Sequence, residues 1–132
     1  MSDIQKDIST LNDDGILTVN IGLELAIKLS AAKQSKFLNL EVQEHLQFII
    51  ENGARLVIKG KPKIIAIFNL GILLEPSLRL DASKILTELS KTIAIIIIWG
   101  NNISQDNRLY WSDWQEKHSF NFNNINLKQI YL

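Results

Sequence analysis

The chain of 132 residues is 46% hydrophobic and 21% charged, which suits one globular domain with a buried core and is unlike a disordered chain. Its 14 basic residues balance its 14 acidic residues, so nothing global attracts nucleic acid or an anionic membrane. The chain has no cysteine, which excludes disulfides, cysteine-type zinc sites and cysteine nucleophiles and favours a cytoplasmic location.

The N-terminal segment, MSDIQKDISTLNDDG, is polar and acidic. We expect a flexible N-terminal arm over residues 1–15, without the apolar centre of a signal peptide. Residues 16–132 are predicted to form a single α/β domain. The most apolar run within this domain, TIAIIIIWG, is much too short to span a membrane, so we expect no membrane partner.

The first part of the domain favours one short strand and two helices. The β-rich stretch 16–20 predicts a strand, and residues 23–33 predict a helix made of strong helix formers. A second helix is expected after Asn39, a residue type that commonly caps helices. Its apolar residues recur with helical spacing, at Val42, Leu46, Ile49 and Ile50.

Two continuous apolar runs, 64–68 and 93–98, are typical of strands with both faces covered, as in a parallel sheet between helices. Between them, residues 81–91 predict a helix that Asp81 caps. A strand, a helix and a second strand in this order form a βαβ crossover unit. We therefore predict an α/β fold of three layers, with a mainly parallel sheet of about four strands.

The glycines of the chain do not form a phosphate-binding loop. Such a loop needs glycines whose backbone N–H groups wrap the anion, together with a lysine and a hydroxyl residue. Gly60 and Lys61 are followed by Pro62, which has no N–H and stands where the hydroxyl is needed. The dinucleotide fingerprint G-x-G-x-x-G is also missing, so an ordinary ATPase is not expected.

Two stretches, VNIGLELAIKLS and NLGILLEPSLRLDASKILTELSKTIAIIIIWG, resemble the small P-loop protein family of type 3 BREX phage-defence systems. That family joins a P-loop ATPase core to an N-x-x-L-E-L-x-x-x-L segment, an acidic-proline loop before a helix, and a strand that ends in Trp-Pro-Gly. The matching residues are Asn20, Leu23, Glu24, Leu25, Leu29, Asn69, Leu70, Glu75, Pro76, Leu78, Leu80, Asp81, Trp99 and Gly100. The resemblance extends over residues 16–101 and implies a P-loop-NTPase-like fold.

The departures from the family pattern concern its chemistry. The family's first strand and phosphate loop have no counterpart ahead of residue 16. Phe68 stands where the family places the acid of its magnesium shell, and Gly71 stands where it places the acid that polarises water. The resemblance therefore implies a degenerate P-loop fold, a pseudo-ATPase, for which we predict no catalytic residue, no cofactor and no metal ion.

The C-terminal part of the chain contains aromatic and basic residues that suit a binding surface. The candidate partner-binding residues are Trp99, Arg108, Tyr110, Trp111, Trp114 and Lys117. Trp99 follows a buried strand, at the sheet edge where ligands of open parallel sheets collect. The others lie in the segment 108–117, where the aromatic residues fit one side of a helical turn. Such residues dominate protein–protein hot spots and also stack on nucleic-acid bases, although covering the sheet is the simpler interpretation for any single ring.

These patterns predict a non-enzymatic adaptor or accessory subunit of a bacterial phage-defence or mobile-element complex. A sheet that lacks the family's first strand exposes an edge, which invites a protein partner or self-association into an oligomer. The alternative is a nucleic-acid-binding module that uses the aromatic and basic segment 108–117. A third interpretation is an enzyme with an unrecognised site, but the two histidines, His45 and His118, belong to no dense ligand motif.

Overall fold

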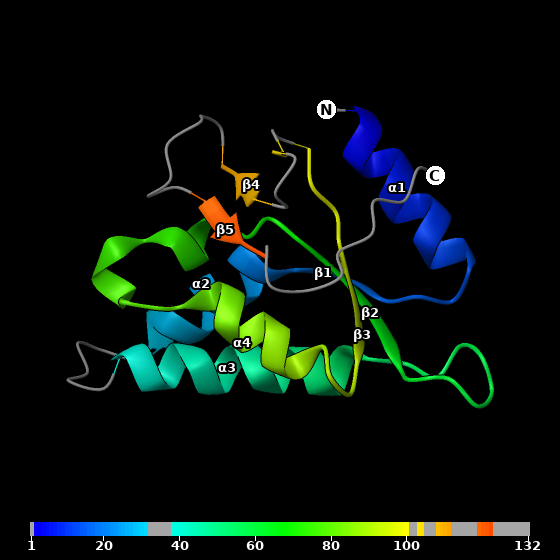
Figure 1. Ribbon diagram of the computed structural model, residues 1–132, viewed down its shortest axis with the longest axis horizontal. Coiled ribbons are helices and arrows are strands. Elements are labelled where there is room, and N and C mark those ends of the chain that lie inside the picture. The colour runs from blue at the N-terminus through cyan, green and yellow to red at the C-terminus, as the bar shows by residue number, and fades with distance from the viewer. Residues whose placement is uncertain (1, 32–37, 101–102, 105–107, 112–118, 123–132) are drawn as a thin grey trace.

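The computed structural model describes residues 2–31, 38–100, 103–104, 108–111 and 119–122. Its centre is a parallel sheet in the order β1-β2-β3, formed by β1 (Thr18–Asn20), β2 (Ile64–Phe68) and β3 (Ala94–Ile97) (Figure 1). The register places Val19, Ile67 and Ile97 side by side across the sheet. The parallel direction confirms the prediction made from the two continuous apolar runs.

Helices surround this sheet in the described part of the chain. They are α1 (Ser2–Asp13), α2 (Ile21–Ala31), α3 (Leu38–Gly53) and α4 (Ala82–Leu89), with 3₁₀ turns η1 (Gly71–Leu74) and η2 (Pro76–Leu78). The strands β4 (Arg108–Tyr110) and β5 (Ser119–Asn121) form a separate antiparallel pair. None of the described helices is both long and apolar enough to cross a bilayer.

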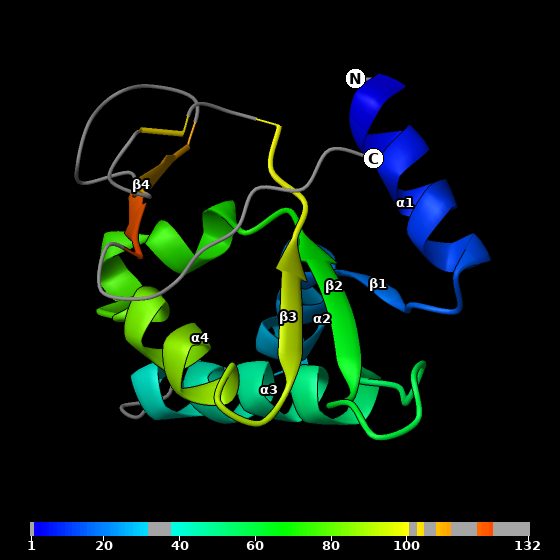
Figure 2. The same ribbon diagram turned by 45° about the vertical axis from the view of Figure 1, so that its right-hand side comes forward.

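Different helices cover the two faces of the sheet. Side chains at odd-numbered positions of β2 and β3, such as Ile65 and Ile97, pack into the main core with residues of α2, α3 and α4. Side chains at even-numbered positions, such as Ala66 and Ile98, pack with Leu11 of α1 in a second, smaller core. Figure 2 shows α1 and α4 on opposite sides of the strands. The protein is therefore a mixed α/β fold in which the sheet lies between helical layers.

The βαβ unit formed by β2, α4 and β3 also agrees with the sequence. Asp81 precedes α4, and its Oδ1 accepts a hydrogen bond of 3.2 Å from the backbone N–H of Lys84, as expected of a helix cap. Asn39 differs from its prediction, because α3 begins one residue earlier. Its side-chain Nδ2 donates hydrogen bonds of 2.7 Å to the carbonyls of Leu78 and Arg79, which fixes the start of α3 against η2.

The N-terminal segment forms helix α1, and the expectation of a flexible arm over residues 1–15 was wrong for this part of the chain. Ile4, Ile8 and Leu11 recur at positions i, i+4 and i+7, which gives one apolar stripe along the helix. Leu11 is buried against the sheet, and Ile4 and Ile8 pack beside it. The many acidic and polar residues between these three positions obscured the stripe in the composition.

Residues Arg108–Tyr110 form strand β4, so the prediction of a helical turn was wrong for these residues, and its remainder from residue 112 lies outside the described residues. Leu109 is buried, whereas its neighbours Arg108 and Tyr110 are only half-buried, which is the alternation of a strand. Pairing with β5 places Leu109 opposite the buried Phe120. The two strands thus add a small covering layer to the main core.

Candidate functional site

The carboxyl end of β1 is the place where an α/β nucleotide fold would hold phosphate. Here β1 ends at Asn20 and α2 begins at Ile21, so no residue lies between the strand and the helix. The side-chain Oδ1 of Asn20 accepts a hydrogen bond of 2.9 Å from the backbone N–H of Leu23 and caps the helix. A phosphate loop needs several free N–H groups at this corner. The direct passage from β1 to α2 leaves no room for such a loop, and Asn20 accepts a hydrogen bond from one of the N–H groups at the start of the helix.

The carboxyl end of β2 is tied to this same corner. Asn69 follows β2 with a left-handed backbone conformation, at φ 59°, which asparagine tolerates better than most residues. Its Nδ2 donates a hydrogen bond of 2.8 Å to Oδ1 of Asn20, and its carbonyl accepts one of 3.0 Å from the N–H of Gly22. A Cβ at Gly22 would lie 2.5 Å from Nδ2 of Asn69, so this close approach requires glycine. Asn20 and Asn69, two residues of the family resemblance, are therefore hydrogen-bonded to each other.

The carboxyl end of β3 leads into an aromatic cluster formed by Trp99, Trp111 and Phe120. The ring centroid of Trp99 lies 5.6 Å from that of Trp111 and 5.7 Å from that of Phe120, in both cases edge to face. A Cβ at Gly71 would lie 2.6 Å from the indole ring of Trp111, so this ring rests directly on η1. The cluster holds β4 and β5 against the end of the sheet.

The predicted partner-binding residues are thus only partly brought together. Trp99 and Trp111 pack against each other, where they cover the sheet. Arg108 lies on β4, and its guanidinium Nη1 donates a hydrogen bond of 3.1 Å to Oγ of Ser119. Tyr110 lies on the same face of β4 as Arg108. Trp114 and Lys117 lie outside the described residues.

Nucleic-acid binding by segment 108–117 would need a particular arrangement of its aromatic and basic side chains. A stacking platform needs aromatic faces open to solvent beside free cationic groups. In the described part of the segment, Trp111 is half-buried in edge-to-face contact with Trp99, and Arg108 is engaged with Ser119. These three side chains therefore give the nucleic-acid alternative no support.

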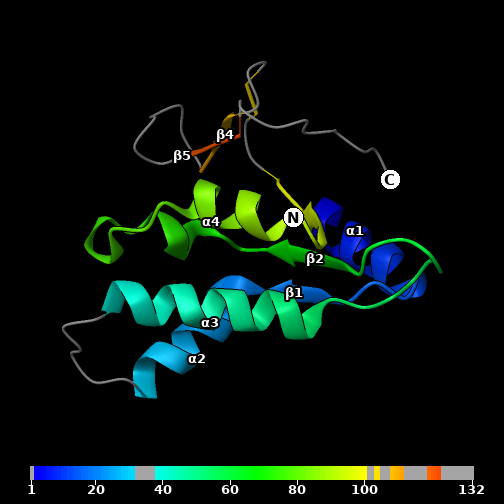
Figure 3. The same cartoon turned by 60° about the horizontal axis from the view of Figure 1, so that its bottom comes forward.

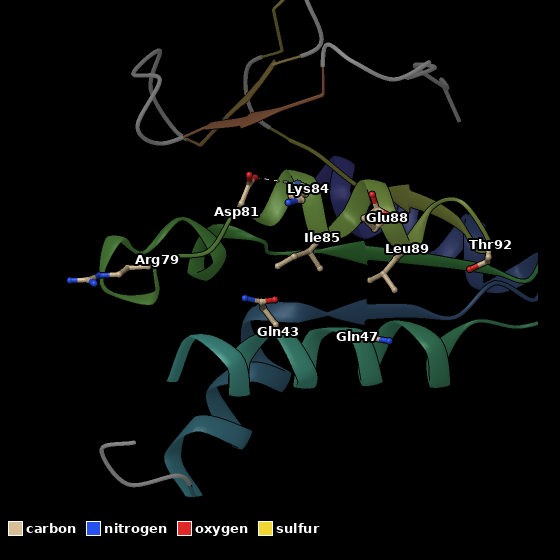
Figure 4. A pocket seen from close by; sticks show the side chains of 9 residues that line it. All are labelled: Gln43, Gln47, Arg79, Asp81, Lys84, Ile85, Glu88, Leu89 and Thr92. Atoms are coloured by element: carbon tan, nitrogen blue, oxygen red, sulfur yellow. Dashed lines mark hydrogen bonds between the residues drawn. The ribbon is translucent and has the colours of Figure 1, made fainter. Parts of the chain in front are cut away.

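A groove of about 580 Å³ lies between α3 and α4 and was not predicted from the sequence. Its lining residues are Gln43, Gln47, Arg79, Asp81, Lys84, Ile85, Glu88, Leu89 and Thr92. Figure 4 shows Ile85 and Leu89 pointing from α4 toward α3, while Arg79 extends away from the groove. Because the lining comes from two helices far apart in sequence, no local motif could have indicated it.

Several polar groups of this groove already have partners close by in the chain. Gln43 donates a hydrogen bond of 2.6 Å to Asn39, and Gln47 donates one of 2.6 Å to Glu51. Glu88 forms an exposed ion pair of 3.1 Å with Lys91. Within the described residues, no group of three or more carboxylate or histidine side chains is placed to hold a metal ion. Four of the polar residues that line the groove are thus engaged by neighbouring residues.

The outward side of α2 carries exposed apolar residues. Ile21 and Leu25 are fully buried on the inner side of the helix, but Leu23 and Ile27 on the outer side remain 54% and 56% exposed. Phe48 of α3, which is 58% exposed, lies beside α2, because the Lys28 ammonium is 5.8 Å from its ring centroid. We call Leu23, Ile27 and Phe48 the α2 surface. Figure 3 shows α2 at the margin of the molecule, with no other described element beyond it.

No protein-family model matches the chain, and no curated protein and no solved structure matches it either. The function therefore has to be argued from the residues and their geometry. The aromatic residues were recognisable from the sequence, but the hydrogen bond between Asn20 and Asn69 joins two distant segments. The exposure of Leu23 and Ile27 was equally hidden, because a helix that is apolar on most sides is normally buried.

Proposed function

We propose that the chain is a non-enzymatic adaptor or accessory subunit of a bacterial phage-defence or mobile-element complex, built on a P-loop-like fold without nucleotide chemistry. The resemblance to the BREX family supports the biological setting. The corner formed by Asn20, Gly22 and Asn69 supports the loss of nucleotide chemistry, because its polar groups are bonded to one another. As a pseudo-ATPase, the protein would act through contacts with other proteins.

The α2 surface is the observation that carries this proposal. Large apolar side chains that stay exposed next to one another mark protein interaction sites more often than isolated ones do. Leu23 and Ile27 are one helical turn apart, and Phe48 of α3 lies near the same helix, with its ring centroid 5.8 Å from the Lys28 ammonium. A partner that buries these side chains removes apolar area from water at about 25 cal/mol per Å². We therefore propose that an apolar segment of a partner protein docks on this surface.

Coexpression with the products of the genes adjacent to its own gene tests the adaptor function. We expect the chain to elute together with one of these products in size-exclusion chromatography. The double substitution Leu23→Lys and Ile27→Lys should abolish co-elution, because charged groups would have to be buried in the interface. The matched control is Leu56→Lys with Ile58→Lys, which changes two similarly exposed residues far from α2 in sequence. Equal co-elution of both variants would contradict docking on the α2 surface.

Titration calorimetry with ATP and magnesium tests the loss of nucleotide chemistry. We expect no heat of binding, because β1 passes into α2 without a phosphate loop. Micromolar binding of ATP would overturn this part of the proposal. The variant Asn20→Ala is informative alongside it, because it frees the N–H of Leu23 but creates no loop, and we expect it to bind no ATP either.

A further inference from the structure

We propose that β3 pairs antiparallel with β3 of a second copy of this chain, so that the two three-stranded sheets join into one. This inference does not depend on the adaptor function or on the α2 surface. It starts from the hydrogen-bonding groups at the outer edge of β3, which is paired on its other side with β2.

The backbone groups of Ile95 and Ile97 point to this outer edge. The N–H groups of Ala94 and Ile98 donate hydrogen bonds of 2.9 Å to carbonyls of the β2 segment. Because backbone groups alternate in direction along a strand, those of Ile95 and Ile97 face away from β2. In the part of the chain that the structure describes, neither residue has a hydrogen-bond partner on that side. The edge thus offers two donors and two acceptors to an incoming extended strand.

The occupant must be apolar on both of its faces. Ile95 and Ile97 pack against the main core on one face of the sheet, and Ile96 and Ile98 pack against the α1 core on the other. A strand added at this edge extends both layers and meets apolar neighbours on each side. The chain contains only two continuous apolar strand sequences, and β2 is already paired along both edges. The β3 strand of a second copy is apolar on both faces and therefore meets this requirement.

Charge also favours a second copy. The run from Thr92 to Gly100 contains no charged residue, so antiparallel pairing of two such runs places no like charges opposite each other. Natural edge strands are commonly protected from this pairing by lysine, proline or a bulge. The run TIAIIIIWG contains neither lysine nor proline, so the usual sequence protection is missing.

The available backbone groups fix the register. The N–H of Ile93 donates to the carbonyl of Leu89 at 3.1 Å and is not available to a second chain. Only Ile95 and Ile97 remain, so the register that uses both pairs Ile95 with the partner's Ile97. Ile96 then lies on the two-fold axis, opposite the partner's Ile96, in a pair without mutual hydrogen bonds.

Light scattering coupled to size-exclusion chromatography of the full chain tests the association. We expect a mass twice that of the 15.0 kDa chain, falling toward the monomer on dilution. A monomer at every concentration would overturn the proposal. If the Leu23→Lys and Ile27→Lys variant became monomeric while the unmodified chain was a dimer, the α2 surface and not β3 would be the interface.

A single engineered thiol tests the register, because the chain has no cysteine of its own. In the proposed pairing the Cα atoms at position 96 lie about 4.5 Å apart, within the range that a disulfide bridges. Ile96→Cys should therefore give a covalent dimer under mild oxidation. Ala94→Cys is the control, because position 94 is more exposed but lies about 14 Å from its copy in this register. Equal cross-linking of both variants, or of the control alone, would contradict the register.

Hydrogen exchange separates a second copy from any other occupant of the edge. We expect the amides of Ile95 and Ile97 to exchange slowly in the dimer and at least tenfold faster after dilution to the monomer. Slow exchange in a monomeric sample would mean that the edge is covered in another way, and this would overturn the proposal.

Discussion

Strands β2 and β3 have almost the same chemistry but different surroundings. Residues 64–68 read IIAIF and residues 94–97 read AIII, and residues 64–67 pair in parallel with residues 94–97. In β2, Ile65, Ala66 and Ile67 are fully buried, whereas Ala94 is exposed and the three isoleucines of β3 are half-buried. The difference comes from position, because β2 has a strand on each side and β3 has one only in the described part of the chain.

This contrast shows what a continuous apolar run does and does not indicate. The run predicts that both faces of a strand are covered, and both faces of β2 and β3 do contact helices. It contains no information on how many neighbouring strands there are. The free edge of β3 therefore follows from the topology and not from the local sequence.

The largest expected difference between the two strands comes from a buried charge. Ala66→Asp would place a carboxylate among Leu11, Ile16 and Ile98, where the described part of the chain offers no buried polar partner. We expect a loss of at least about 3 kcal/mol, which is enough to unfold much of a marginally stable domain. Ala94→Asp should change the free energy of unfolding by less than about 1 kcal/mol, because position 94 is exposed. Urea denaturation at high dilution measures both, and equal losses would contradict the contrast.

Truncation of register partners should give a smaller difference. Ile67 and Ile97 lie side by side, and their side chains contribute to the same core. Ile67→Ala should cost about 3 kcal/mol, because the buried side chain leaves a cavity. Ile97→Ala should cost about 1 kcal/mol, because this side chain is only partly buried. The same urea experiment gives the two values, and a larger loss at position 97 would reverse the comparison.

Substitutions in the connection between β2 and β3 should cost less stability than those in the strands. Asp81→Ala removes the acceptor for the N–H of Lys84 at the start of α4, and we expect a loss of about 1 kcal/mol. Asp81→Ser keeps an acceptor at the same place and should restore most of this loss. Thermal unfolding followed by circular dichroism measures both variants. If alanine and serine were equivalent, the cap would contribute nothing.

The smallest effect is expected at the end of the same connection. Lys91 forms an ion pair with Glu88, but their side chains are 65% and 60% exposed. Lys91→Ala should therefore change the free energy of unfolding by no more than about 0.5 kcal/mol, and added salt should reduce even this. A loss greater than that of Asp81→Ala in the same thermal melts would be inconsistent with a solvent-screened pair.

Much of the sheet and of its connecting helices could be predicted from local patterns. The strand at 64–68 has the predicted ends, and Asp81 caps α4 as expected. Helix α1 was not predicted because only three apolar residues form its inner face. The acidic residues around them suggested an exposed arm. The strand at Arg108 was not predicted because aromatic side chains at close spacing fit a helical turn as well as a strand end.

The candidate sites were less predictable, because each depends on contacts between distant segments. The hydrogen bond between Asn20 and Asn69 spans 49 positions, and the groove lies between α3, which precedes β2 in the chain, and α4, which follows it. The exposure of Leu23 could not be inferred either, because the sequence of α2 does not say which of its apolar sides is covered. Long-range packing decides these features.

The passage of β1 directly into α2 has a consequence for how this fold can change. A point substitution replaces side chains, but it cannot create backbone between Asn20 and Ile21. Building a phosphate-binding turn here would require inserted residues, and these would also have to separate Asn69 from the start of the helix. Point substitutions alone therefore cannot create a phosphate-binding loop at this corner. The exposed side of α2, in contrast, can be changed one residue at a time.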